Sequence, residues 1–236
     1  MKWKQFVLWL AAVTLSAIFM SGCGHTNVTS NAENETAQTA ARTLTIMIYM
    51  VGSDLETDGG AATSDISEMQ AACANSQANV LIYTGGSEKW WSGIPSDQNC
   101  VYLLGDSDLT SVNQTSSMNM GEPATLTGFL DYAYANYPAD AYALILWDHG
   151  AGPIEGYGFD ELHEYDQLTL SEMHQALENS ALNQAGVRLS WMGFDACLMC
   201  SIETANVMSD FSDYMIASQE AVPNQGWDYS FLSASS

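Results

Sequence analysis

Residues 144–150 read Leu-Ile-Leu-Trp-Asp-His-Gly, and residues 189–197 read Leu-Ser-Trp-Met-Gly-Phe-Asp-Ala-Cys. Each stretch has the apolar character of a buried strand, and each ends in a reactive side chain, His149 in the first and Cys197 in the second. In a parallel α/β sheet, ligands and chemistry collect outside the carboxyl ends of the strands. The two stretches therefore predict one shared active site with a cysteine nucleophile.

Apolar runs alternate with helical patterns on both sides of these two strands. The helical spacing at 125–137 ends before Pro138, and Thr169 with Glu172 has the arrangement of a capping box. Such alternation predicts right-handed crossovers and an α/β sandwich around a mostly parallel sheet. The expected strands cover residues 44–51, 80–84, 100–104, 143–147, 189–194 and 214–217, and the expected helices cover 64–73, 125–137, 169–182 and 198–208.

The charge of the chain excludes one class of partner. There are 28 Asp and Glu against 5 Lys and Arg, which gives a formal net charge of -23 at pH 7. Binding to phosphates needs clustered Lys and Arg, so we expect no nucleic acid partner. An acidic surface attracts cationic ligands, although it is equally typical of a soluble exported protein.

The first residues have the pattern of a targeting segment. Lys2 and Lys4 precede an apolar stretch at 6–20 that is too short for a membrane span, and small residues stand directly before Cys23. This pattern resembles a bacterial lipoprotein signal, in which Cys23 becomes the lipid-modified first residue of the mature protein. An ordinary signal peptide is the alternative, and it also implies export.

The expected domain organisation follows from these patterns. The signal segment covers 1–22, and residues 23–41 are rich in Asn, Thr, Ser and Ala, which predicts a polar tether. The folded domain is expected over 42–236, truncated at its C-terminus. We therefore expect an exported lipoprotein that is anchored through Cys23 to the membrane at the bacterial cell surface.

Cys197 is expected to lie between a strand end and the start of the helix predicted at 198–208. The partial positive charge of a helix N-terminus favours the thiolate, which is the attacking form, and its N–H groups can hold an oxyanion. The glycines that follow His149 let a substrate backbone come close. Either residue alone would be a weak signal, and the pair is what predicts catalysis.

Three motifs together resemble the clostripain family of cysteine peptidases, in the caspase and gingipain group. They are Trp-Asp-His-Gly at 147–150, Phe-Asp-Ala-Cys-Leu-Met at 194–199 and Tyr-Met-Val-Gly-Ser-Asp-Leu-Glu at 49–56. The resemblance implies a caspase-like α/β sandwich with His and Cys at adjacent strand ends. It also implies cleavage after Arg or Lys, and therefore protein or peptide substrates with basic residues.

The resemblance further assigns roles to single residues. It implies that Cys197 is the nucleophile and His149 the general acid that protonates the leaving amine, with the oxyanion held by the backbone N–H groups of Cys197 and Gly150. It implies that Asp195 lines the pocket for the basic side chain, while capping of the following helix is the structural alternative for this residue. Glu220, which follows the next expected strand, is a second candidate for the pocket border.

The chain departs from the family in one respect. Many members mature by cutting themselves at a basic residue after the catalytic His, but residues 151–186 contain no Lys or Arg, and Arg188 opens the next expected strand. We therefore expect activity as a single chain, or processing by another enzyme.

No metal site is predicted and no cofactor is required by this chemistry. Calcium is a candidate cofactor because some relatives use it. Asp54, Glu56, Asp58 and Asp65 are suitable acids, but their spacing matches no EF-hand loop, and an acidic surface explains them as well.

Two other classes of function stay open. Cys197 and Cys200 form a Cys-x-x-Cys pair, which thiol–disulfide exchange proteins use. A non-catalytic lipoprotein that binds cationic peptides is the other class. Cys73 and Cys100 are either paired or separately buried, and the sequence does not decide between these states.

Overall fold

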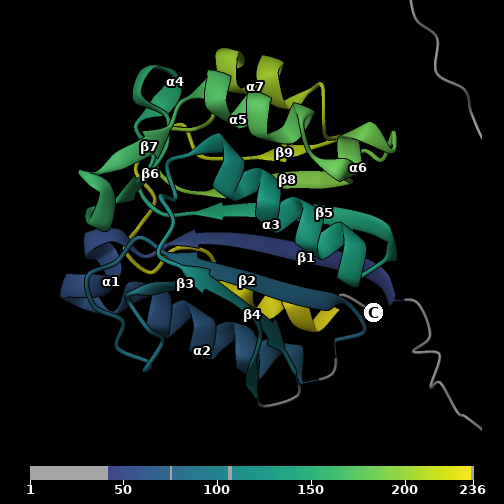
Figure 1. Ribbon diagram of the computed structural model, residues 1–236. Helices are drawn as coiled ribbons and strands as arrows, with labels where there is room; N and C mark the ends of the chain where they lie inside the picture. Colours follow the sequence, from purple (N-terminus) through teal and green to yellow (C-terminus); the bar gives the residue numbers. More distant parts are fainter. Residues whose placement is uncertain (1–41, 75, 106–107, 235–236) are drawn as a thin grey trace, which may run out of the picture. The chain divides into compact units, whose positions relative to one another are not determined.

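The computed structural model describes residues 42–74, 76–105 and 108–234, so the predicted signal segment, Cys23 and the predicted tether lie outside the described residues. Seven strands form one sheet in the order β4-β3-β2-β1-β5-β8-β9 (Figure 1). All neighbouring pairs are parallel except β2 with β3 and β3 with β4. The strands are β1 (Arg42–Val51), β2 (Asn79–Gly85), β3 (Gln98–Leu104), β4 (Leu109–Ser116), β5 (Ala139–Trp147), β8 (Trp191–Asp195) and β9 (Met215–Ile216).

Helices cover both faces of the sheet (Figure 1). On one face lie α2 (Ala61–Cys73) and the 3-10 helix η2 (Tyr229–Ala234), and on the other lie α3 (Pro123–Asn136), α5 (Leu170–Glu178), α6 (Ala181–Gln184) and α7 (Ile202–Met208). None of the helices in the described part of the chain has the length and apolar character that a bilayer span requires. The predicted α/β sandwich around a mostly parallel sheet is confirmed.

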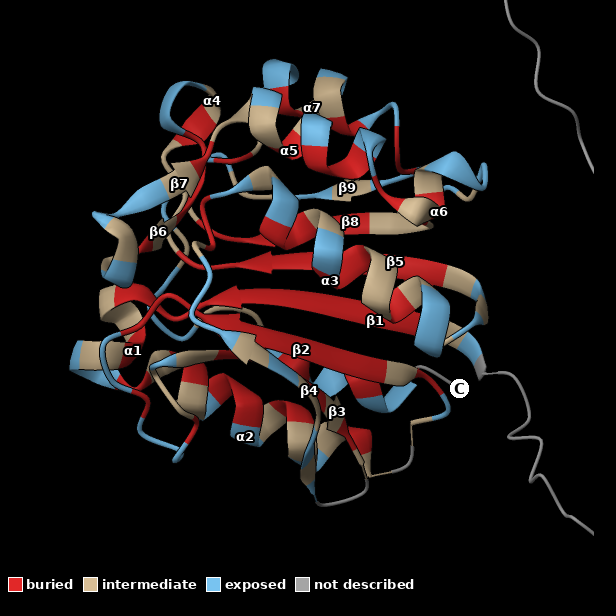
Figure 2. Ribbon diagram, in the orientation of Figure 1, coloured by how far each residue is buried: buried red, intermediate tan, exposed pale blue. Residues whose placement is uncertain are grey.

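Because helices cover both faces of the sheet, β1 is apolar at successive positions and does not alternate between apolar and polar residues. Successive side chains of a strand point to opposite faces. Met47, Tyr49 and Val51 therefore pack in the core on the α3 side, and Ile46, Ile48 and Met50 pack in the core on the α2 side. Figure 2 shows the central strands buried along most of their length. A parallel sheet covered on both faces requires such continuous apolar strands.

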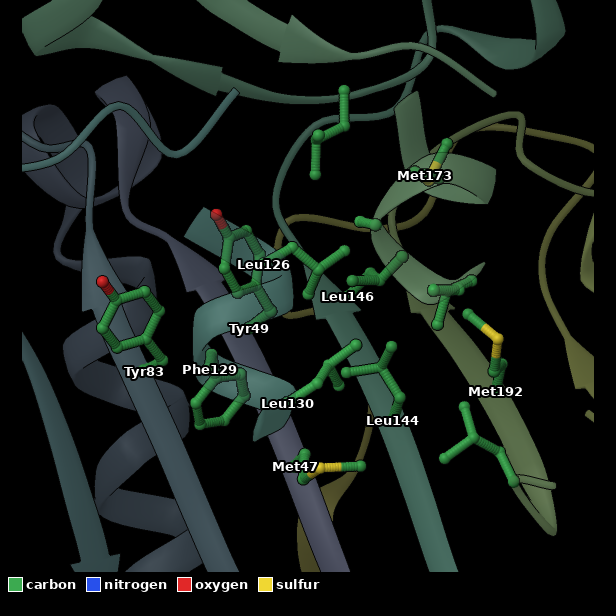
Figure 3. Packing of buried hydrophobic residues seen from close by; sticks show 14 of the residues in the cluster. Met47, Tyr49, Tyr83, Leu126, Phe129, Leu130, Leu144, Leu146, Met173 and Met192 are labelled. Atoms are coloured by element: carbon green, nitrogen blue, oxygen red, sulfur yellow. The ribbon is translucent and has the colours of Figure 1, made fainter. Parts of the chain in front are cut away.

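The core on the α3 side holds the ends of the central strands in place. Leu126 and Leu130 of α3 pack over β1 and β5, and the rings of Tyr83 and Phe129 stack with centroids 5.2 Å apart (Figure 3). The buried hydroxyl of Tyr157 lies 2.7 Å from the carbonyl oxygen of Tyr49 and 3.0 Å from that of Trp147. This hydroxyl ties the carboxyl ends of β1 and β5 together.

Three of the differences from the sequence prediction have a clear physical reason. β4 was not predicted because it is an edge strand, partly exposed along its length, and its residues are mostly polar. The helix predicted over 169–182 begins with the expected capping box at Thr169 and Glu172 but is two helices, because Ser180 caps a new helix, α6. The helix predicted over 198–208 begins only at Ile202, where Ser201 is the N-cap residue of α7.

The carboxyl ends of the central parallel strands meet at one edge of the sheet. The register pairs Val51 with Gly85, Met50 with Trp147, and Trp147 with Asp195. Figure 1 shows the following short elements at this edge: α1 (Ser53–Gly59), α4 (Gly152–Glu155), β6 (Tyr157–Asp160) and β7 (Asp166–Leu168). The segments with Asp54, His149 and Cys197 leave the sheet at this edge, side by side.

Candidate active site

His149 and Cys197 lie beside each other at the ends of neighbouring strands. Trp147 of β5 is paired with Asp195 of β8. His149 lies two residues after Trp147, and Cys197 lies two residues after Asp195. Both line one open cleft, together with Trp147, Asp195, Val222 and other residues. The structure therefore brings the predicted imidazole and thiol to the same cavity.

The two loops are also in direct contact. A Cβ built on Gly150 would lie 2.1 Å from the carbonyl oxygen of Cys197, which is a separation that real atoms do not tolerate. Only a glycine at position 150 allows the His149 loop to approach the Cys197 loop this closely. In the described chain, the N–H groups of Gly150 and Cys197 donate to no protein acceptor, so both are free to bind an oxygen.

His149 is oriented by a carboxylate from the first turn of α1. Its Nε2 lies 2.8 Å from Oδ1 of Asp54, and both side chains are half-exposed. The His149 ring also meets the edge of Phe159, with ring centroids 5.9 Å apart. A carboxylate at Nε2 favours the tautomer with the proton on that nitrogen, which leaves Nδ1 available to a reacting group. Asp54 was singled out in the sequence only as a candidate calcium ligand, so this contact was missed.

The carboxyl group of Asp148 links the segment with His149 to the start of α1 and to β6. It is buried and accepts hydrogen bonds from the hydroxyl of Ser53 at 2.5 Å and from the N–H of Phe159 at 2.6 Å. Burial raises the pKa of Asp148 to about 7, although these hydrogen bonds and the nearby His149 oppose the shift. Ser53 takes a backbone φ of 47°, which is uncommon for a residue other than glycine. This strained turn directs the Ser53 hydroxyl at Asp148.

Cys197 does not lie at a helix N-terminus, so that prediction is wrong. The following residue, Leu198, has a φ of 64°, and α7 begins only at Ile202. The sulfur instead accepts a hydrogen bond from the N–H of Val222 at 3.2 Å. That N–H presents a partial positive charge to the sulfur, as the helix was expected to do. Because Val222 is 25 residues further along the chain, no local pattern could have indicated this donor.

The segment with Val222 runs alongside the cysteine loop. The N–H of Leu198 donates to the carbonyl oxygen of Glu220 at 3.2 Å, and the N–H of Cys200 donates to that of Ser218 at 2.9 Å. The side chain of Glu220 is exposed and does not line the cleft, so the expected role at the pocket border is not supported. Glu220 contributes its backbone carbonyl, which helps to hold the cysteine loop.

Asp195 forms part of the cleft wall, two residues before Cys197. It is 4% exposed, and its Oδ2 accepts hydrogen bonds from the N–H of Trp227 at 3.0 Å and from the hydroxyl of Tyr229 at 2.9 Å. Burial raises the pKa of Asp195 above its ordinary value. Because Ser201 caps α7, Asp195 is not a helix cap, which was the structural alternative for it.

The remaining cysteines lie outside this arrangement. Cys73, Cys100, Cys197 and Cys200 are all free thiols. Cys73 and Cys100 are buried, and burial raises the pKa of Cys73 to about 11, which keeps it protonated. Cys200 is half-buried and precedes α7, whereas it falls inside the helix predicted over 198–208.

Three of the four acids considered for calcium, Asp54, Glu56 and Asp65, are engaged in protein contacts. Both carboxylate oxygens of the buried Glu56 are used, by the N–H and hydroxyl of Thr63 and by the N–H of Trp91. Asp54 binds His149. Within the described ranges, no group of three or more His, Cys, Asp or Glu side chains is arranged to hold a metal ion.

A mostly parallel α/β sheet with an imidazole and a thiol at neighbouring strand ends is the arrangement of a cysteine peptidase. The model of the clostripain family, peptidase family C11, matches residues 48–236. The chain therefore belongs to the clostripain family of cysteine peptidases.

Comparison with single proteins agrees with this assignment. Clostripain from Hathewaya histolytica is 31% identical over 147 residues, which cover 54% of this chain and 27% of clostripain. A secreted C11 cysteine protease from Bacteroides thetaiotaomicron, solved with an irreversible peptide inhibitor, has a TM-score of 0.67 at 21% identity over 81% of this chain. An inactive zymogen C11 protease from Parabacteroides distasonis has a TM-score of 0.64 at 23% identity, again over 81%. The chain covers 53% and 52% of these two structures, whose likeness concerns the fold.

Proposed function

We propose that this protein is a cysteine endopeptidase that hydrolyses peptide bonds after Arg or Lys. The observation that carries the proposal is the cleft itself, in which Cys197, His149 and the buried carboxyl group of Asp195 line one wall. An anionic group beside the nucleophile selects a cationic side chain, because an uncharged side chain would leave the buried carboxylate without a countercharge. The formal net charge of -23 also attracts basic peptides.

The residues of the cleft account for each step of the reaction. The sulfur of Cys197 attacks the carbonyl carbon, and the N–H groups of Gly150 and Cys197 bind the oxyanion that forms. His149 gives a proton to the departing amine, which leaves a thioester between the substrate and Cys197. Water then attacks the thioester, with His149 accepting a proton from it, and releases the acid and the thiol. Asp54 keeps the His149 ring in place through its contact with Nε2.

The location and partners are proposed from the sequence. The signal pattern at 1–22 and the small residues before Cys23 support export and a lipid anchor, with the peptidase domain tethered at the bacterial surface. The B. thetaiotaomicron C11 protease is described as secreted, which is consistent with a family that works outside the cell. Substrates are proteins or peptides with basic residues, and calcium is a candidate cofactor whose effect an assay with and without chelator would measure.

The test uses fluorogenic peptides that end in Arg or Lys beside matched peptides that end in Asp or Leu. Hydrolysis of the basic peptides should be lost in Cys197→Ala and retained in Cys200→Ala, which is the matched control for removal of a thiol. Loss in both variants, together with reduction of insulin disulfides by the wild type, would favour exchange chemistry through the two cysteines. Binding of basic peptides without turnover would show a binding protein and contradict the proposal.

A further inference from the structure

Asp65 of α2 lies next to the proposed substrate pocket, although α2 is distant in sequence from both reactive residues. It is 6% exposed, and its Oδ2 accepts a hydrogen bond of 2.7 Å from the indole N–H of Trp147, which lines the cleft. Asp65 also lines a second, larger hollow that shares Leu55, Ala61 and Asn224 with the cleft. The two hollows therefore adjoin, and Asp65, which lines the second hollow, contacts the cleft through Trp147.

Gly226 brings Asp65 and Asp195 into one arrangement. A Cβ built on Gly226 would lie 2.8 Å from Oδ2 of Asp195 and 3.1 Å from Oδ2 of Asp65. The two carboxyl groups thus face one point next to a glycine that itself lines the cleft. With a φ of 62°, Gly226 takes a left-handed conformation that disfavours other residues, and its lack of a side chain lets the backbone approach both acids closely.

Neither carboxyl group has a countercharge in the described protein. The ion pairs of the described residues do not involve Asp65 or Asp195. Lys89 lies over the ring of Trp91, and Arg188 pairs with Asp213. Ionising both of these neighbouring buried acids costs free energy, because their negative charges repel each other and are shielded from water. A cation from outside the chain would therefore stabilise the ionised pair strongly.

We propose that Asp65 is a second specificity-determining carboxyl group of the cleft, which acts with Asp195 to pair with the cationic side chain of the substrate. This inference rests on the proposed function, because it assumes that the cleft receives an Arg or Lys side chain. Two carboxyl groups give a guanidinium more acceptors than one can provide, and they make a neutral side chain more costly to accommodate.

The pair also links substrate binding to pH. Burial raises the pKa of Asp65 to about 7, and the neighbouring charges of Asp195 and Glu68 act in the same direction, against the hydrogen bond from Trp147. The buried hydroxyl of Tyr229 faces the same two acids and stays protonated. Binding of a cation should therefore release a proton from the pair to the solvent.

The first experiment measures binding without catalysis. Benzamidine, a small cation related to the guanidinium group, is titrated into the Cys197→Ala protein and followed by calorimetry. Asp65→Asn keeps an acceptor for the Trp147 N–H and should raise the Kd about tenfold, as the loss of one charged hydrogen bond would. Asp58→Asn is the matched control, because Asp58 is an exposed acid on the second hollow with no contact to Asp195, and it should leave the Kd unchanged. Benzamidine binding that is equal in Asp65→Asn and its parent, or absent from the parent, would overturn the inference.

The second experiment separates this inference from the proposed function. For the active enzyme, the ratio of kcat/KM on an Arg peptide to kcat/KM on a matched Gln peptide cancels the contributions of Cys197 and His149, which serve both substrates. The ratio should rise with pH through about 7 in the wild type and fall about tenfold in Asp65→Asn. Equal losses on both peptides would make Asp65 purely structural and leave the proposed function intact. A wild type without preference for Arg or Lys would refute the basic specificity itself.

Discussion

Gly150 approaches the carbonyl oxygen of Cys197 so closely that no side chain fits between them, since a Cβ would lie 2.1 Å from that oxygen. This contact sets the spacing between the imidazole and the thiol. It also places the two N–H groups that are proposed to hold the oxyanion.

We expect Gly150→Ala to separate the two loops and reduce kcat/KM on basic peptides by about a hundredfold, the scale of losing one oxyanion donor. The matched control is Gly128→Ala in α3, where a Cβ would meet no atom within 4 Å. That variant should keep full activity and gain about 0.5–1 kcal/mol of stability, as alanine does in a helix. Full activity in Gly150→Ala would show that the contact is dispensable.

Asp54 is predicted to act as a positioning residue for His149. In Asp54→Asn the amide can donate to Nε2 and so favour the other tautomer of the ring, which should lower kcat about tenfold to a hundredfold with little change in KM. Asp58→Asn removes an acid from the same helix and serves as the control. A lower kcat/KM caused by a higher KM alone would speak against a role in orienting the imidazole.

The buried Asp148 predicts a specific pH dependence of stability. Its pKa is about 7 in the folded protein, against an ordinary value of 3.8 for an aspartate, so between these values the folded state retains a proton that the unfolded state has lost. Stability should therefore fall as pH rises through this window, by at most about 1.4 kcal/mol per pH unit from this group.

Asp148→Asn should remove this contribution, because an amide can still accept from the Phe159 N–H and donate to the Ser53 hydroxyl. The measurement is urea unfolding of both proteins at several pH values between about 4 and 8. The stability difference between variant and wild type should grow in favour of the variant as pH rises. A difference that does not change with pH would mean that Asp148 ionises normally in the folded state.

The peptidase domain should remain one chain under conditions in which it cleaves basic peptides. The stretch 151–186 has no Lys or Arg, and Arg188 is held by Asp213 and by the carbonyl oxygens of Ser209, Asp210 and Ser212. A side chain bound in this way is not free to enter the cleft of another molecule. Denaturing gels should show one band for wild type and for Cys197→Ala, whereas two bands in the wild type alone would reveal self-cleavage.

The sequence predicted those parts of the fold and site that depend on local patterns. Apolar runs indicate the buried strands that lead to His149 and Cys197. Because neighbouring parallel strands end at the same edge of the sheet, the two residues lie together. The capping box at Thr169 was predictable because it lies within four residues.

Contacts between distant segments were not predictable in the same way. The N–H of Val222 at the sulfur, Asp54 at Nε2 and Asp65 beside Asp195 each join elements whose spacing depends on how helices pack on the sheet. Periodicity also could not show that Leu198 takes a left-handed turn, which delays α7 and removes Cys197 from the helix N-terminus. The polar edge strand β4 lacks the apolar signal on which strand prediction relies.

The most direct test of the central claim is to treat the protein with an irreversible peptide inhibitor that ends in Lys and to map the adduct by mass spectrometry. Because His149 and Cys197 share one cleft with the acidic pocket, the inhibitor should modify Cys197 once per molecule, and His149→Ala should slow this modification severely. A matched inhibitor that ends in Asp should react far more slowly. An adduct on Cys200 instead of Cys197, or equal labelling by the two inhibitors, would contradict the account.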